Sequence, residues 1–151
     1  MLKNIFLITF LFFINSCGYT SVYKNSENQD FQITVSKTQG DRELNNLIKN
    51  EINLYSNKNS INKFDIVLNT NYEKLVLAKN VNGKITDYKL SANSSITIYF
   101  NEMSYKKNFS EAINIKNQTN TFEQNLYEKN ILRNFASSIR EKLLLEIINL
   151  K

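Results

Sequence analysis

The sequence predicts an α+β protein, a two-layer sandwich in which two helices pack on a mostly antiparallel four-stranded sheet in the order β-α-β-β-β-α. Two stripes of apolar residues with helical spacing, over 41–56 and 122–150, flank alternating strand patterns at 63–109. An Asn-Gly pair at 82–83 predicts a hairpin turn between two of those strands. Each helix has one apolar stripe, so both need a common sheet face, while the other face can stay wet.

The first strand and helix follow from local patterns. In "FQITV", Phe31, Ile33 and Val35 alternate on one face, which predicts a short strand. Gly40 then breaks the chain, and Asp41 supplies an N-cap for a helix over 41–56. The apolar residues of that helix recur at steps of three and four: Leu44, Leu47, Ile48, Ile52 and Tyr55.

The second strand carries its apolar residues on alternate positions and then changes parity. The first set is Phe64, Ile66, Leu68, Thr70 and Tyr72, after which the pattern continues at Leu75 and Leu77. Because a one-residue slip turns every side chain to the other face, this change predicts a bulge near Glu73–Lys74. A two-residue turn at Asn82–Gly83 would place Val81 opposite Lys84, Lys79 opposite Thr86 and Leu77 opposite Tyr88.

The third strand is unusually long, about 17 residues, and ends at a second turn near Asn101–Glu102. "MSYKKNF" then predicts a fourth strand with Tyr105 and Phe109 inward, whereas "SEAINIKNQTNT" has no clear period. The last helix, over 122–150, presents one apolar face: Leu132, Ala136, Ile139, Leu143, Ile147 and Leu150.

The N-terminus predicts export and a lipid anchor. Lys3 precedes the apolar run "IFLITFLFFI", which is far shorter than the roughly 20 residues of a membrane-spanning helix. Ile14-Asn15-Ser16-Cys17 matches a bacterial lipobox, in which the Cys thiolate is alkylated by diacylglycerol and the new N-terminus is acylated. We therefore expect a signal peptide at 1–16, a lipidated tether at 17–30 and a single α+β domain at 31–151. Gly18, rather than Asp, after the Cys favours sorting to the outer membrane.

Several kinds of site are excluded by composition. The chain has one Cys and no His, so it can form neither an internal disulfide nor a zinc or Cys/His catalytic site. A formal net charge of +5 is compatible with an anionic partner and does not indicate nucleic acid. We expect no enzyme activity, no metal and no cofactor, although a carboxylate pair assembled by folding stays open.

At this point the chain resembles the LPS-assembly lipoprotein (LptE) family in its alphaproteobacterial form. Three features carry the resemblance: Cys17-Gly18-Tyr19 followed by Val22-Tyr23, the long hairpin between Phe64 and Phe100, and the terminal helix "EKNILRNFASSIREKLLLEI". The resemblance implies an outer-membrane lipoprotein on the periplasmic side that partners the LptD β-barrel. It further implies that the protein helps the barrel assemble and plugs it during lipopolysaccharide insertion into the outer leaflet, without covalent catalysis.

Two lysines are candidate lipopolysaccharide ligands. The predicted pairing places Lys79 and Lys84 on one face near the hairpin tip, where two ammonium groups could share one phosphate. The alternative is that they are solubilising charges on a solvated hairpin. A second function also stays open, namely an independent lipid-carrying or scaffolding envelope lipoprotein, which as a carrier would need an enclosed apolar cavity.

Overall fold

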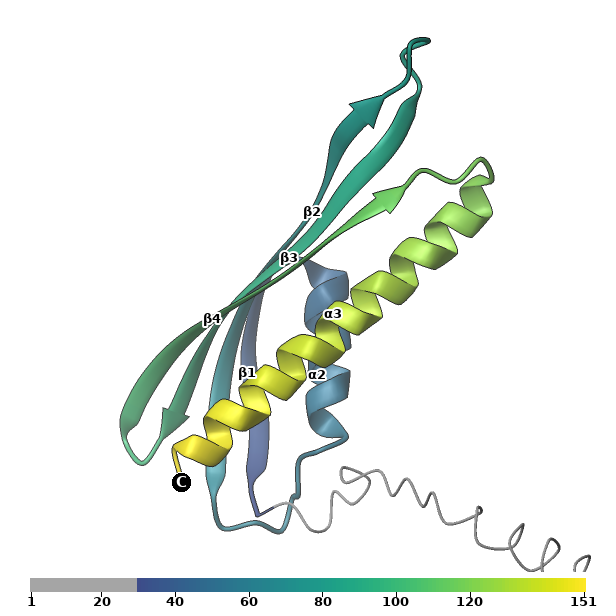
Figure 1. Ribbon diagram of the computed structural model, residues 1–151. Helices are drawn as coiled ribbons and strands as arrows, with labels where there is room; N and C mark the ends of the chain where they lie inside the picture. The colour runs from purple at the N-terminus through teal and green to yellow at the C-terminus, as the bar shows by residue number, and fades with distance from the viewer. Residues whose placement is uncertain (1–29) are drawn as a thin grey trace, which may run out of the picture.

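Four strands lie side by side in chain order, and both helices cover one face of the resulting sheet (Figure 1). The computed structural model describes residues 30–151, so the predicted signal peptide, Cys17 and the tether through residue 29 lie outside the described residues. The elements are β1 (Gln32–Gly40), α2 (Arg42–Asn53), β2 (Lys63–Lys79), β3 (Ile85–Phe100), β4 (Met103–Lys116) and α3 (Thr121–Asn149). The predicted α+β class and element order are confirmed.

The sheet is mixed, because β1 pairs parallel to β2 while β2–β3 and β3–β4 are antiparallel. Parallel neighbours need a crossover, and α2 provides it. The crossover begins at Gly40, whose φ is +84°, and at Asp41, whose side chain accepts a 2.8 Å hydrogen bond from the Leu44 N–H. The predicted N-cap is therefore confirmed.

β1 is longer and α2 shorter than predicted. The second half of β1 is polar and exposed, so it carries no apolar alternation, yet it pairs with β2 as far as Gly40 opposite Thr70. α2 ends at Asn53 because the next residues bond to β1 instead of extending the helix. The Ser56 hydroxyl accepts a 2.8 Å hydrogen bond from the Ile33 N–H, and the Asn57 N–H donates to the Phe31 carbonyl.

The predicted bulge at Glu73–Lys74 is wrong. Pairing between β2 and β3 is unbroken from Asp65 to Val76, and the register shifts only beyond it, at Leu77 and again between Ala78 and Lys79. Lys74 therefore keeps the inward parity of Tyr72. Its ammonium is satisfied there, since it lies 2.5 Å from a Glu128 carboxylate oxygen on α3 and 4.1 Å from the centre of the Tyr88 ring. A charged residue can thus hold an inward position that the sequence pattern assigned to solvent.

β4 continues well beyond the predicted "MSYKKNF". Asn101 and Glu102 both have positive φ, as a two-residue hairpin turn requires, and β4 then pairs with β3 from Met103 to Lys116. The stretch without a clear period is therefore strand, and Glu111 within it faces α3. Its carboxylate accepts a hydrogen bond from the Ser138 hydroxyl at 2.7 Å and pairs with Lys142 at 2.5 Å. This inward charge hides the alternation.

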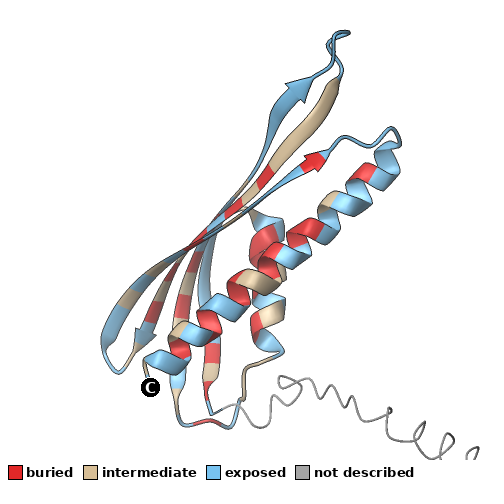
Figure 2. Ribbon diagram, viewed as in Figure 1, coloured by how far each residue is buried: buried red, intermediate tan, exposed pale blue. Residues whose placement is uncertain are grey.

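The hydrophobic core lies between the sheet and the two helices, in the middle of the molecule (Figure 2). The predicted α3 face is confirmed at Leu132, Ala136, Ile139, Leu143 and Ile147, which are all buried, and Leu150 is half-buried. No helix among residues 30–151 is long and apolar enough to cross a bilayer.

Candidate functional site

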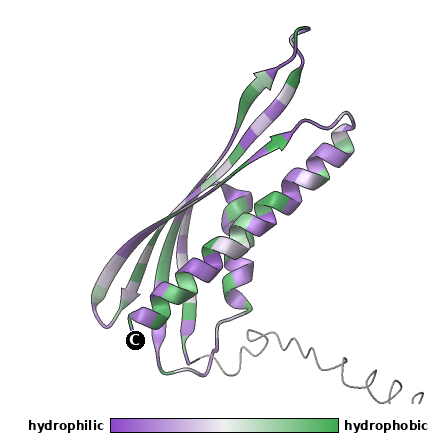
Figure 3. Cartoon of the chain, viewed as in Figure 1, coloured by the Kyte–Doolittle hydropathy of each residue, from purple (hydrophilic) through white to green (hydrophobic). Residues whose placement is uncertain are grey.

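The β2–β3 hairpin projects past the helical layer (Figure 1). β2 keeps alternate residues buried as far as Thr70, and from Glu73 to Lys79 every residue is exposed (Figure 2). The projecting part nevertheless carries apolar side chains: Leu75, Val76 and Leu77 are each about half-exposed, and Val81 in the turn is fully exposed. Figure 3 shows apolar residues, in green, among the polar residues of the hairpin. Contiguous exposed apolar residues are typical of an interaction surface.

The turn at the hairpin tip differs from the predicted two-residue turn. Gly83 has a φ of +76° and its N–H donates to the Asn80 carbonyl, while the Asn80 N–H donates to the Lys84 carbonyl. These bonds enclose three residues, 81–83, with glycine in the left-handed position. The Asn80 side chain favours this longer turn, because its Oδ1 accepts from the N–H groups of both Asn82 and Lys84 at 3.0 Å.

This turn separates the two candidate lysines. Lys79 lies opposite Ile85 rather than Thr86, and Lys84 lies opposite Asn80 rather than Val81. The lysines therefore occupy successive rungs of the ladder, whose side chains leave the hairpin on opposite faces. Both side chains are exposed. The predicted arrangement, with two ammonium groups on one face sharing one phosphate, is wrong, whereas a role for each lysine in binding lipopolysaccharide stays a prediction.

The tip end of β3 is tied to the segment between β4 and α3. Asn117 donates from its backbone N–H to the Thr86 carbonyl at 2.7 Å and from its side chain to the Ile85 carbonyl at 3.1 Å. These bonds hold the hairpin close to its turn, and the Lys74–Glu128 ion pair holds it where it leaves the body of the protein. The projecting part is therefore an ordered extension of the sheet.

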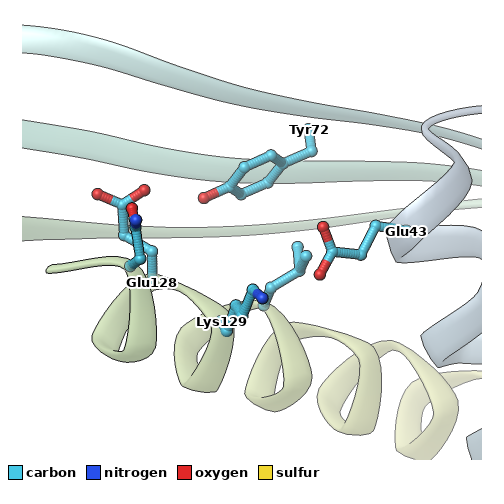
Figure 4. Close-up of a pocket in the computed structure, with 6 residues that line it drawn as sticks. Glu43, Tyr72, Glu128 and Lys129 are labelled. Atoms are coloured by element: carbon cyan, nitrogen blue, oxygen red, sulfur yellow. The ribbon is translucent and has the colours of Figure 1, made fainter. Parts of the chain in front are cut away.

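A cleft of about 220 Å³ lies beneath the hairpin root, between β2 and the adjoining ends of α2 and α3. Figure 4 shows Tyr72 on the sheet side of the cleft, Glu128 and Lys129 on α3, and Glu43 on the side of α2. Glu128 also accepts a hydrogen bond from the Gln124 amide. Glu128 is also paired with Lys74, so the ammonium groups of Lys74 and Lys129 balance the carboxylates of Glu43 and Glu128 at this cleft.

The chemistry of the cleft is limited by its tyrosine. Burial, followed by the charges of Glu128, Asp41 and Glu43, raises the pKa of Tyr72 from 10.0 to about 12. At neutral pH the phenol therefore stays protonated and is available as a hydrogen-bond donor. Residues 30–151 contain no cluster of three acidic or thiol side chains placed to hold a metal ion.

The face of the sheet away from the helices is polar. Two rows of aligned side chains cross its centre, and a hollow of about 350 Å³ lies over them: Asn69–Ser95–Asn108 and Asn71–Asn93–Ser110. Within the second row the Ser110 hydroxyl donates to the Asn93 side chain at 2.7 Å. Amides and hydroxyls at these positions suit contact with water or with a polar surface, as the alternation of the strands predicts.

Solved structures with a similar fold are bacterial lipoproteins. Rare lipoprotein B from Shewanella oneidensis superposes with a TM-score of 0.59 at 10% identity, over 81% of this chain and 96% of that one. A provisionally assigned lipoprotein from Caulobacter crescentus gives 0.58 at 9% identity, over 80% and 89%. The uncharacterized lipoprotein B from Nitrosomonas europaea gives 0.50 at 10% identity, over 78% and 84%. No family model matches the chain, and no curated protein matches it by sequence. At these identities the likeness shows the fold, which is one that bacterial lipoproteins have.

Proposed function

We propose that this protein is an outer-membrane lipoprotein, anchored through Cys17 on the periplasmic side, that forms a complex with the LptD β-barrel. In this role it helps the barrel assemble and plugs it while lipopolysaccharide is inserted into the outer leaflet. The observation that carries the proposal is a fold shared with a solved bacterial lipoprotein over 96% of that protein's chain, in a sequence with a lipobox at residues 14–17. The resemblance of the sequence to the LptE family supplies the partner.

The surface of the domain suits a plug. The lumen of a large outer-membrane barrel is polar, and the uncovered sheet face presents rows of asparagine and serine to such a wall. A carrier of lipid needs instead an enclosed apolar cavity, and the space between sheet and helices is filled by the core side chains. As the resemblance to the LptE family implies, we propose a binding role without covalent catalysis.

Affinity capture tests the partnership. The full-length chain with a C-terminal tag is purified from detergent-solubilised outer membranes, and mass spectrometry is applied both to the mature N-terminal peptide and to the captured proteins. We expect an acylated Cys17 and a stoichiometric large β-barrel identified as LptD. An acylated monomer that carries bound lipid and no barrel would favour the independent lipid carrier. An unmodified Cys17 would remove the anchor from the proposal.

A charge-reversal experiment tests the hairpin lysines. The double variant Lys79→Glu/Lys84→Glu is compared with Lys37→Glu/Lys106→Glu, whose exposed lysines lie away from the tip and whose net charge change is identical. If the tip binds the phosphates of lipopolysaccharide, the first pair weakens binding at low salt about tenfold or more, through two lost charge-assisted contacts, and the second has a much smaller effect. Equal effects in the two variants would show that only overall charge matters.

A further inference from the structure

The described chain begins at one end of the domain, here called the base. Asp30 accepts a 2.9 Å hydrogen bond from the Asn62 side chain to its carbonyl, and its carboxylate forms an ion pair with Lys151. The loop before β2 and the C-terminus of α3 therefore meet where the chain from Cys17 arrives. Figure 1 shows this end opposite the projecting hairpin.

Four apolar side chains are exposed at this end and define the base patch: Ile61, Leu54, Leu145 and Ile148. Their exposed fractions are 88%, 66%, 58% and 54%, respectively. Ile61 precedes Asn62, and Ile148 lies one turn before Lys151. Asn62 and Lys151 are the two residues that contact Asp30. Leu54 follows α2 at the point where Arg140 of α3 contacts Tyr55, with 4.3 Å from the guanidinium carbon to the ring centre.

The base patch includes a largely apolar hollow. It measures about 200 Å³ and is lined by Leu144, Leu145, Ile148 and the neighbouring Arg140 and Glu141. Lys58 and Lys63 flank Ile61 in the sequence and are both exposed. Apolar side chains beside lysines are the combination that binds the headgroup region of an anionic membrane.

We propose that, before a barrel encloses the domain, the base patch rests on the surface of the lipid bilayer to which the chain is anchored. The inference relies on the lipid anchor of the proposed function. Thirteen peptide steps join Cys17 to Asp30, so the anchor lies at most roughly 45 Å from Asp30. The anchor therefore holds the patch close to the membrane, and a contact too weak to recruit the domain from solution can still orient it.

The projecting hairpin also carries exposed apolar side chains, at Leu75, Val76, Leu77 and Val81, but its position removes it from this membrane. β2 runs from the base at Lys63 to the tip at Lys79, and its 17 residues span roughly 55 Å. With the base patch on the bilayer, the hairpin points away from it. The two exposed apolar ends thus have different partners, lipid at the base and protein or lipopolysaccharide at the tip.

Site-specific quenching tests the orientation. The chain has one Cys and no His. In a mature chain with Cys17→Ser, an N-terminal polyhistidine tag is therefore the sole strong nickel ligand. One introduced Cys is then the sole site for a fluorophore. The protein is bound to vesicles of phosphatidylethanolamine, phosphatidylglycerol and nickel-chelating lipid that contain a nitroxide-labelled lipid. We expect most of the fluorescence to be lost from labels at Ile61→Cys and Ile148→Cys, and little from the control Val81→Cys.

Equal quenching at base and tip, or no quenching at the base, overturns the proposal. Adding Leu145→Asn to the Ile61→Cys protein should restore fluorescence, whereas Leu126→Asn, an equally exposed leucine at the far end of α3, should not. If the base label becomes buried in the absence of vesicles as the protein concentration rises, the patch contacts a second copy of the chain. That result would overturn the lipid contact. Because the nickel tag replaces the acyl chains, these results do not depend on whether Cys17 is acylated or a barrel is bound.

Discussion

Gly40 combines a left-handed backbone conformation with a close approach to a neighbouring strand. Its φ is +84°, and a Cβ at this position would lie 1.7 Å from the Thr70 carbonyl oxygen, where Asp41 also donates its N–H. We expect Gly40→Ala to lower the free energy of unfolding by roughly 2–4 kcal/mol, because it combines left-handed strain with a backbone clash. Urea unfolding measures the loss.

Gly83 supplies the matched control for this substitution. Its φ is +76°, but a Cβ at this position would have no neighbouring atom within 4 Å, so Gly83→Ala introduces strain without a clash. It should cost about 1–2 kcal/mol. Equal losses in the two variants would contradict the role assigned to the close approach of Gly40 and Thr70.

Tyr72 gives the protein a specific alkaline sensitivity. Its pKa is about 12 in the folded protein and 10.0 in an ordinary environment, so between these values the unfolded state loses a proton that the folded state retains. Folding stability from this group is intact below pH 10 and falls as the pH rises toward 12. Tyr72→Phe should remove this part of the decline in the urea midpoint. An unchanged decline would contradict the burial of the phenol.

At the scale of elements, Arg140 joins the two helices. Its side chain is 8% exposed, lies 3.2 Å from a carboxylate oxygen of Glu51 in α2, and stacks over Tyr55 in the turn that follows α2. Arg140→Ala leaves Glu51 without this partner and empties a buried volume, so it should cost roughly 2–4 kcal/mol. Lys142 lies on the same helix as Arg140 and forms a more exposed pair with Glu111 of β4. Lys142→Ala breaks that pair and should cost about 1 kcal/mol or less. Similar losses would contradict the bridging role.

Elements whose inward residues are apolar could be predicted from the sequence, and those with inward charges could not. The α3 face and the buried half of β2 follow directly from periodicity. Lys74 and Glu111 face the helices as ion-pair partners, so the pattern misplaced a bulge in β2 and hid the second half of β4. At the candidate site, the sequence placed Lys79 and Lys84 near the hairpin tip but on one face instead of two. The Asn80 side chain sets a turn that the Asn-Gly pair alone does not specify.

At the scale of the molecule, the projecting hairpin reflects a mismatch of lengths. The 17 residues of β2 span roughly 55 Å, whereas the 12 residues of α2 cover about 18 Å and the 29 residues of α3 about 44 Å. Neither helix is long enough to cover the whole strand, and the uncovered part keeps its apolar residues exposed. The exposed apolar side chains accordingly gather at the two ends of the domain, while the middle of the sheet's open face is polar.

This distribution predicts a gradient of amide hydrogen exchange along the β2–β3 hairpin. Amides from Ile66 to Thr70, whose inward side chains are buried, should exchange near the rate set by global unfolding. Those from Ala78 to Ile85 lie beyond the bulge and outside the helical cover, so local opening should expose them orders of magnitude faster. Mass spectrometry of exchanged peptides measures both. In a complex with a barrel that contacts the tip, protection should rise in the second set alone. Uniform slow exchange in the isolated protein would mean that the tip is as stable as the core, and would contradict the link between helical cover and local stability.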